Sequence, residues 1–316
     1  MADSEDQLVL AGMVAHRHYL LGQSRIEIAQ ALGLSRFKVA RLLETARESG
    51  IVRIEVVTPD SIDAGLSAEL QDRYGLAHAV VVDDPGAGAT AEERLGVVSA
   101  RILEEILEDG QTLGLPWSRS VYRMVAALRR LPQVDVVQLT GAMQIPEYDS
   151  SAVDLVRRVA RLSGGTAHLF FAPFVMSDAE GAGRVRADPV VGEVHAAVAD
   201  VDVAMVGVGD WGSGASTLRA VATRGELAQA RRLGVVGEMA GVFFDDQGHT
   251  VEPGLVERLV TVTADELMSI PLVLGVAHGP DKVRAVAAAL RGGLLQGLVT
   301  DGGLARALLD ATDGPA

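Results

Sequence analysis

Apolar residues in the first 58 positions recur at helical spacing, and the breaks between them predict three short helices. The first helical pattern covers residues 5–21 and carries its apolar side chains at Leu8, Val9, Met13, Val14, Leu20 and Leu21. Gly22 ends it, and Ser24 caps a second helix over residues 25–32 with Glu27 completing a capping box. Ser35 caps a third helix that continues to about Glu48.

The turn between the second and third helices is short and contains Gly33, which can adopt the positive φ that a tight turn requires. The third helix buries Val39, Leu42, Leu43 and Ala46, and residues 51–57 after it read as a strand. A helix, a tight glycine turn and a second helix followed by a strand predict a winged helix-turn-helix, whose second helix enters the DNA major groove.

From residue 62 onward, short Val/Leu/Ile-rich runs alternate with helical stretches. The predicted strands cover residues 79–82, 111–115, 134–139, 167–171, 201–208, 235–238, 272–277 and 297–300. Continuous apolar strands between helices are typical of a mostly parallel sheet covered on both faces. We therefore expect an α/β fold with two domains: a winged helix-turn-helix over residues 1–58 and a mostly parallel, Rossmann-like α/β domain over residues 59–316.

The charge of the chain is unevenly distributed. The net charge is −14 and the pI is about 4.9, which taken alone argues against nucleic-acid binding. Residues 59–316 contain 21 cations and 35 anions, which accounts for the whole −14, whereas residues 16–54 contain seven Lys or Arg and three Asp or Glu. The local charge of +4 favours DNA binding over the alternative, a helical bundle with a solvated cationic face.

The residues expected to contact double-stranded operator DNA lie at the starts of the second and third helices, where side chains reach base edges and phosphates. They are Ser24, Arg25, Ser35, Arg36, Phe37, Lys38 and Arg41.

Several classes of site are excluded or find no support. The chain contains no cysteine, which excludes disulfides, thiolate metal sites and a cysteine nucleophile. The seven histidines are scattered without metal-ligand spacing, and we predict no metal, no cofactor and no catalytic residues. The N-terminus lacks the features of a secretory signal and no apolar run is long enough to span a bilayer, so we expect a cytoplasmic protein without a membrane partner.

Polar loops follow several predicted strands, at the edge where open α/β sheets bind ligands. Gly114 begins a loop through Trp117, Ser118, Arg119 and Ser120, which supplies hydroxyls, a guanidinium and a helix N-terminus suited to phosphate. Asp245 lies in a turn after the strand at 235–238, Lys282 at a helix start after the strand at 272–277, and Asp301 after the last strand, where it can also act as a helix cap.

The strand at 201–208 ends in Gly207-Val208-Gly209-Asp210-Trp211-Gly212, which matches the glycine pattern of dinucleotide sites, with Glu226 at a distance suited to a ribose. The Ser/Gly-rich residues 213–217 prolong the loop where a dinucleotide fold would already be helical. A loop that lines a phosphate or polyhydroxyl ligand is therefore the favoured interpretation.

Five segments together resemble the SorC family of bacterial sugar-responsive transcriptional regulators, over nearly the whole chain. They are residues 24–54, containing IAQALGLSRFKVARLLETARESGIVRI, then GLPWSRS at 114–120, QLTGA at 138–142, GEMAGVFFDDQG at 237–248 and AHGPDKVRAVAAALRGGLLQGLVTDGGLA at 277–305. The resemblance implies a winged helix-turn-helix joined to a sensor domain similar to sugar-phosphate isomerases. It also implies assembly as a dimer or dimer of dimers and control of catabolic genes by a phosphorylated sugar or polyol.

The resemblance also implies roles for individual residues of the effector site. Ser118, Arg119 and Ser120 would contact the phosphate, Asp245 and Lys282 the sugar or phosphate, and the pocket would be shaped by Gly114, Trp117, Gly141, Gly207, Gly209 and Asp301. Ser118 and Ser120 stand where many members have Gly and Thr, so an unphosphorylated polyol stays open as the effector. Two other functions also stay open: a sugar-phosphate isomerase or deaminase, and a repressor that senses a nicotinamide dinucleotide.

Overall fold

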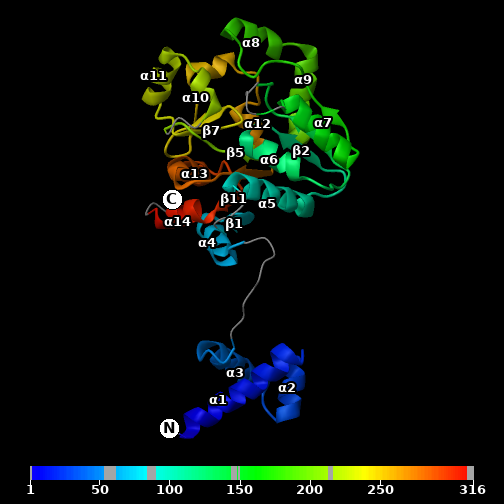
Figure 1. Cartoon of the computed structure of the whole chain (residues 1–316), viewed down its shortest axis with the longest axis vertical. Helices are drawn as coiled ribbons and strands as arrows, with labels where there is room; N and C mark the ends of the chain where they lie inside the picture. Colours follow the sequence, from blue (N-terminus) through cyan, green and yellow to red (C-terminus); the bar gives the residue numbers. More distant parts are fainter. Residues whose placement is uncertain are drawn as a thin grey trace. The chain divides into compact units, whose positions relative to one another are not determined.

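The computed structural model describes residues 2–52, 62–83, 90–143, 148, 150–212 and 216–311, with side chains from residue 7 onward. The chain forms two compact units that divide between residues 57 and 58. Figure 1 shows a helical N-terminal unit and a larger α/β unit. Within the described ranges, no helix is both long enough and apolar enough to cross a membrane.

Capping side chains define the helices of the N-terminal unit. Helix α1 covers Ala2–Ala15 and leads into the π-helical turn η1 (His16–Leu20), and α2 (Arg25–Leu32) and α3 (Arg36–Glu48) follow. The Ser24 hydroxyl accepts from the Glu27 amide in a full capping box, and the Ser35 hydroxyl accepts from the Lys38 amide at 3.2 Å. Gly33 adopts φ 66°, so the predicted helix-turn-helix is present.

The core of this unit is small and comes from all three helices. Ala11 and Val14 of α1 pack with Ile28 of α2 and with the predicted buried face of α3, including Val39 and Leu42. Other apolar side chains of the first helical pattern face solvent: Val9 is 65% exposed, Met13 49% and Leu20 73%. The predicted wing strand lies outside the described residues from position 53 onward.

The α/β unit is built on a seven-stranded sheet in the order β1-β11-β10-β5-β2-β3-β4. Every pairing in it is parallel, which confirms the predicted fold class. The strands are β1 (His78–Val82), β2 (Thr112–Leu115), β3 (Asp135–Gln138), β4 (Ala167–His168), β5 (Val203–Gly207), β10 (Leu272–Val276) and β11 (Gly297–Asp301). The run predicted over 167–171 is strand only in its first two residues.

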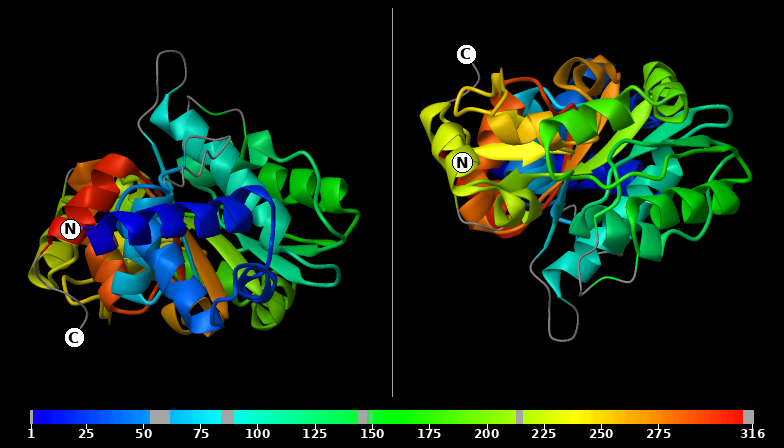
Figure 2. Two further views of the ribbon diagram at one scale, coloured as in Figure 1. Left: turned by 90° about the horizontal axis from the view of Figure 1, so that it is seen from below. Right: turned by 90° about the horizontal axis from the view of Figure 1, so that it is seen from above.

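Helices cover both faces of this sheet (Figure 2). Val203 and Met205 of β5 pack with α5 (Ala91–Ile106), α6 (Arg119–Ala127) and α7 (Ala152–Ser163), whereas Ala204 and Val206 pack on the opposite side. That opposite side is covered by α4 (Ala64–Tyr74), α9 (Pro189–Ala196), α12 (Ala264–Ser269), α13 (Val283–Arg291) and α14 (Gly302–Asp310). Alternation of side chains along a strand thus produces two cores, one on each face.

A second, antiparallel sheet was not predicted by the sequence pattern. It consists of β6 (Gly209–Asp210), β7 (Gly237–Met239), β8 (Val242–Phe244) and β9 (Thr250–Val251). The run at 235–238 therefore pairs in a hairpin and does not join the parallel sheet. Ala240 and Gly241 make the hairpin turn with φ 50° and 84°, and a positive φ at an alanine gives no sequence signal.

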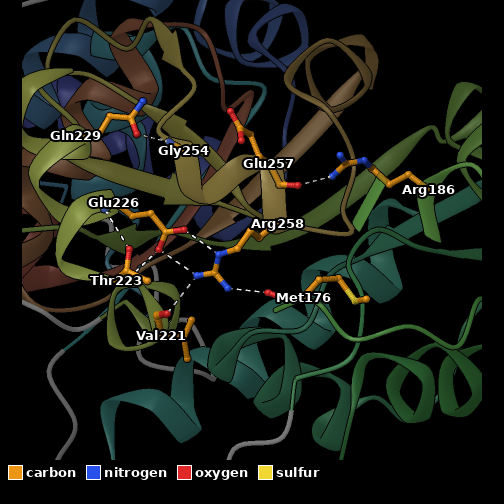
Figure 3. A network of polar contacts seen from close by, with 9 residues as sticks. All are labelled: Met176, Arg186, Val221, Thr223, Glu226, Gln229, Gly254, Glu257 and Arg258. Carbon is orange, nitrogen blue, oxygen red and sulfur yellow. Dashed lines mark hydrogen bonds and ion pairs between the residues drawn. The ribbon is translucent and has the colours of Figure 1, made fainter. Parts of the chain in front are cut away.

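Arg258 connects segments around the small sheet (Figure 3). It lies in η3 (Gly254–Arg258), and its guanidinium donates to both carboxylate oxygens of Glu226 at 2.8 and 3.0 Å and to the Met176 carbonyl at 2.6 Å. Glu226 lies in α11 (Arg224–Arg232) and is the N3 residue of a capping box with Thr223. The bonds from Arg258 lower the pKa of Glu226 to about 2. The remaining helices near this network are α8 (Ala179–Arg186) and α10 (Thr217–Val221).

Candidate functional site

A cavity of about 180 Å³ lies at the carboxyl ends of the parallel strands β2, β5 and β10. This edge of a parallel sheet is where open α/β folds bind ligands. Seven of the residues expected at the effector site line it together: Trp117, Ser118, Arg119, Ser120, Gly207, Gly209 and Lys282. The fold therefore brings together a loop after β2, the end of β5 and the start of α13.

The loop after β2 is held in one conformation by hydrogen bonds at its centre. The Trp117 amide donates to the Thr140 hydroxyl at 3.1 Å, and its indole Nε1 donates to the Ser150 carbonyl at 2.7 Å. Ser118 then caps α6 by accepting from the Val121 amide at 3.1 Å. The first turn of α6, which contains Arg119 and Ser120, consequently lines the cavity, and its dipole favours a bound anion there.

Two glycines leave room for side chains that line the cavity. A Cβ atom on Gly207 would lie 2.7 Å from the Ser118 hydroxyl oxygen, and one on Gly209 would lie 2.2 Å from Glu238 Oε1. Neither glycine has a positive φ, so space and not backbone conformation requires them. Any side chain at these positions would displace groups that line the site.

Cationic side chains from two separate elements meet in the cavity. Lys282, at the end of η4 (Pro280–Lys282), donates from Nζ to the Val208 carbonyl at 2.9 Å. Burial lowers the pKa of Lys282, and the positive charge of Arg119 lowers it further. Two cations that disfavour each other in a partly desolvated site would both be stabilised by an anionic group between them.

Glu238 is a buried carboxyl group in the wall of the cavity, and it was not predicted as a site residue. Its Oε1 accepts from the Ser216 hydroxyl at 3.0 Å, and its Oε2 accepts from the Gly241 amide at 3.4 Å. Burial raises the pKa of Glu238. The two hydrogen bonds and the charge of Lys282 act in the opposite direction but do not cancel this rise. A single glutamate inside the apolar segment 237–244 was the available sequence signal.

Glu92 and His278 also line the cavity and were not predicted. His278 Nε2 lies 3.1 Å from Glu92 Oε1, which joins the start of α5 to the segment after β10. Arg123 of α6 and Asp281 of η4 complete the charged lining. Nothing in the sequence singles out Glu92, because acidic residues are common in the first turn of any helix.

Four residues expected at the effector site do not line this cavity. Gly114 packs against Val201 and Leu139 in the core, and Gly141 lies where a Cβ would meet the backbone of residues 173 and 174. Asp245 accepts from the amides of Gln247 and His249 in the turn after β8. Asp301 caps α14 with one oxygen and accepts from the Gly279 amide with the other.

The glycine pattern at residues 207–212 has a geometry unlike that of a dinucleotide site. Gly207 ends β5, and Gly209 and Asp210 form β6, so no helix begins within the pattern. Glu226, the candidate ribose ligand, is bound to Arg258. In the part of the chain that the structure covers, no cluster of three or more His, Asp or Glu residues could hold a metal ion.

The residues expected to contact DNA all lie on the surface of the N-terminal unit. Each of the seven is exposed: Ser24, Arg25, Ser35, Arg36, Phe37, Lys38 and Arg41. Arg36, Phe37 and Lys38 form the first turn of α3 after the Ser35 cap. The start of α3 therefore carries exposed cationic side chains, the feature expected of a recognition helix.

Comparisons with known proteins agree with this architecture. A family model named Sugar-bind, described as "Putative sugar-binding domain", matches residues 61–310. The chain is 33% identical over 317 residues to transcriptional regulator LsrR of Enterobacter sp. (strain 638), covering 98% of this chain and 94% of that protein.

Two further similarities extend over nearly the full length. The erythritol catabolism regulatory protein EryD of Brucella abortus (strain 2308) is 28% identical over 319 residues, covering 99% of this chain and all (100%) of that protein. The crystal structure of the full-length sorbitol operon regulator SorC from Klebsiella pneumoniae has the same fold, with a TM-score of 0.70 and 24% identity, covering 96% of this chain and 100% of that chain.

Proposed function

Since the chain belongs to the SorC family of sugar-binding transcriptional regulators, we propose that it controls transcription by binding operator DNA and a sugar-derived effector. The N-terminal unit binds the DNA, and the cavity at the strand ends of the α/β unit binds the effector. Relatives named as regulators of transcription and of erythritol catabolism support a role in carbohydrate catabolism.

The effector is a phosphorylated sugar or polyol. One observation carries this proposal: the first turn of α6, Arg119 and Lys282 line a single cavity. A helix N-terminus and two cations match the charge and the oxygen geometry of a phosphate. Ser216, Glu238 and the Glu92–His278 pair supply donors and acceptors for hydroxyl groups on the remainder of the ligand.

The DNA-bound form is an oligomer, a dimer or a dimer of dimers. Val9, Met13 and Leu20 are exposed apolar side chains of the N-terminal unit, and contact with a second copy would remove them from water. Pairing two recognition helices matches the twofold symmetry of operators. Because the protein binds operator DNA in this proposal, it acts in the cytoplasm, where bacterial DNA lies.

Effector binding shifts an equilibrium between two arrangements of the subunits. A difference of about 1–3 kcal/mol in effector affinity between the two arrangements is enough to change operator occupancy severalfold. In this proposal the effector is bound and released unchanged, and the protein is not an enzyme.

A thermal-melting screen tests the effector site. We expect sugar phosphates or polyol phosphates to raise the melting temperature of the full-length protein and NAD(H) to leave it unchanged. Replacing Lys282 by Gln should lower the affinity for the responding compound about tenfold or more, because a charge-assisted hydrogen bond to the anion is lost. Arg284→Gln is the matched control, since Arg284 is exposed and pairs with Asp246 outside the cavity.

The same screen and a turnover assay on the responding compound together separate the competing functions. Conversion of the responding compound to a product would establish the isomerase or deaminase alternative, and a shift with NAD(H) alone would establish the dinucleotide sensor. For DNA binding, Arg36→Ala and Lys38→Ala should weaken binding to a duplex selected from a random pool, more at low salt, while effector binding is kept. Equal DNA affinity of both variants and the parent at matched salt would contradict the assignment.

A further inference from the structure

Phe37 is the most exposed large apolar side chain among the described residues, at 87%. It is the second residue of α3, immediately after the Ser35 cap and Arg36. It belongs to none of the hydrophobic clusters that hold the described part of the chain together. The ring therefore adds nothing to the core of the unit and is free to contact a ligand.

The direction of Phe37 follows from helical geometry. The buried residues of α3 are Val39, Leu42, Leu43 and Ala46, which pack on α1 and α2. At 3.6 residues per turn, Phe37 and Arg41 project from the side opposite to this buried face. The ring therefore lies at the centre of the surface that a recognition helix would present to a groove.

The charges around Phe37 favour contact with DNA at the first two turns of α3. Arg36 and Lys38 flank the ring in sequence, and Phe37, Lys38 and Arg41 line one shallow surface hollow. The later turns carry Glu44, Arg47 and Glu48, all exposed, so their net charge is negative and disfavours phosphates. The attractive half of the helix is thus the half that contains Phe37.

We propose that Phe37 reads thymine bases in the operator by packing against their 5-methyl groups in the major groove. This inference rests on the proposed DNA binding and adds the base that the helix selects. A phenyl ring has no hydrogen-bond donor or acceptor for the polar edges of adenine, guanine or cytosine. The thymine methyl is the one apolar group that unmodified base pairs present in the major groove.

The experiment compares thymine with uracil at single positions. The wild-type full-length protein selects a duplex from a random pool by repeated binding and amplification. Each thymidine of that duplex is then replaced in turn by deoxyuridine, which removes only the methyl group. We expect at least one position per half-site where the replacement weakens wild-type binding about fourfold. This factor corresponds to the free energy of burying one methyl-sized group.

Variants identify the side chain responsible. Phe37→Ala should bind the thymine and uracil duplexes equally at that position, and Phe37→Leu should keep part of the difference. Ile26→Ala truncates another exposed apolar side chain, on α2, and should keep the full difference. Melting temperatures should not change, because Phe37 contributes no core packing.

Three results would overturn the inference. These are a selected duplex with no uracil-sensitive position, a Phe37→Ala variant that retains the wild-type ratio, and a Phe37→Ala variant that changes only the oligomeric state without DNA. Failure to enrich any duplex is a different result, because it contradicts the proposed DNA binding itself and the inference with it.

Discussion

Small residues determine where the cavity can exist. Gly207 leaves room for the Ser118 hydroxyl, which caps α6 and so directs the first turn of that helix to the cavity. Gly209 leaves room for the carboxyl group of Glu238. The Ser118 and Glu238 side chains can thus adopt their positions because neither glycine has a Cβ atom.

Replacing Gly207 by Ala is expected to impair effector binding. The new methyl group would lie 2.7 Å from the Ser118 oxygen, which has to move, and its bond to the Val121 amide weakens. We expect at least a tenfold loss of effector affinity, about 1.4 kcal/mol, measured by titration calorimetry.

Gly192→Ala is the control for this substitution. Gly192 lies in α9, and a Cβ there would meet nothing within 4 Å. The control should keep wild-type affinity and melt slightly higher, because alanine favours a helix over glycine by up to about 1 kcal/mol. An unchanged affinity in Gly207→Ala would contradict the proposed position of the site.

Arg258 and Arg186 join separate elements of the α/β unit by polar contacts. Arg258 links η3 to α11 through Glu226 and to the segment at Met176, and its side chain and that of Glu226 are largely buried. Arg186 of α8 reinforces the same region by donating to the carbonyls of Glu257 and Leu259. A bidentate guanidinium–carboxylate pair in a partly buried position contributes more than a surface ion pair.

Arg258→Met is therefore expected to lower the free energy of unfolding by about 2 kcal/mol at neutral pH. The pKa of Glu226 is about 2 in the folded protein and 4.5 ordinarily, so its contribution is fully present above pH 4.5. That contribution is lost as the pH falls towards 2. The difference between wild type and variant should accordingly shrink over this range in urea-unfolding curves.

Arg284→Met serves as the comparison for Arg258→Met. Its pair with Asp246 is exposed, and exposed pairs contribute little to stability. We expect its unfolding free energy to stay within about 0.5 kcal/mol of wild type at every pH. A gap between wild type and Arg258→Met that stays constant from pH 7 to pH 3 would show that Glu226 is not held by Arg258.

At the scale of the whole molecule, the charge is divided unequally between the two units. The acidic excess of 14 lies in residues 59–316, and the helix-turn-helix carries a local positive charge. Under the proposed function, the acidic unit would repel DNA and so restrict the contact to the N-terminal unit. The division of the chain between residues 57 and 58 allows each unit to be tested alone.

A fragment of residues 58–316 is expected to keep effector binding and lose DNA binding. All of the residues that line the cavity belong to this fragment. The effector-induced rise in melting temperature should equal that of the full chain, and fluorescence anisotropy should detect no binding to the selected duplex. Loss of the melting response in a folded fragment would mean that the N-terminal unit contributes to the effector site.

Local interactions explain which parts of the fold could be predicted. The bounds of α2 and α3 followed from Ser24, Ser35 and Gly33, because a cap acts within three or four residues of its own position. The parallel sheet followed from apolar runs between helices. The antiparallel sheet did not, because Ala240, the first residue of its turn, adopts a positive φ that alanine rarely takes, and Gly241 alone is no signal for a hairpin.

The sequence by itself determined the helix-turn-helix, the parallel α/β architecture and the family, because these depend on caps, periodicity and short motifs within a few residues. The sequence also predicted Ser118 and Lys282 as members of the site, but only the tertiary structure showed which polar residues meet in the cavity, Glu92 and Glu238 among them. Glu92, Ser118, Glu238 and Lys282 are far apart in the chain and converge at one sheet edge, whereas Asp301 is turned to a helix cap. Strand order and register set these contacts, and they arise from packing over the whole unit.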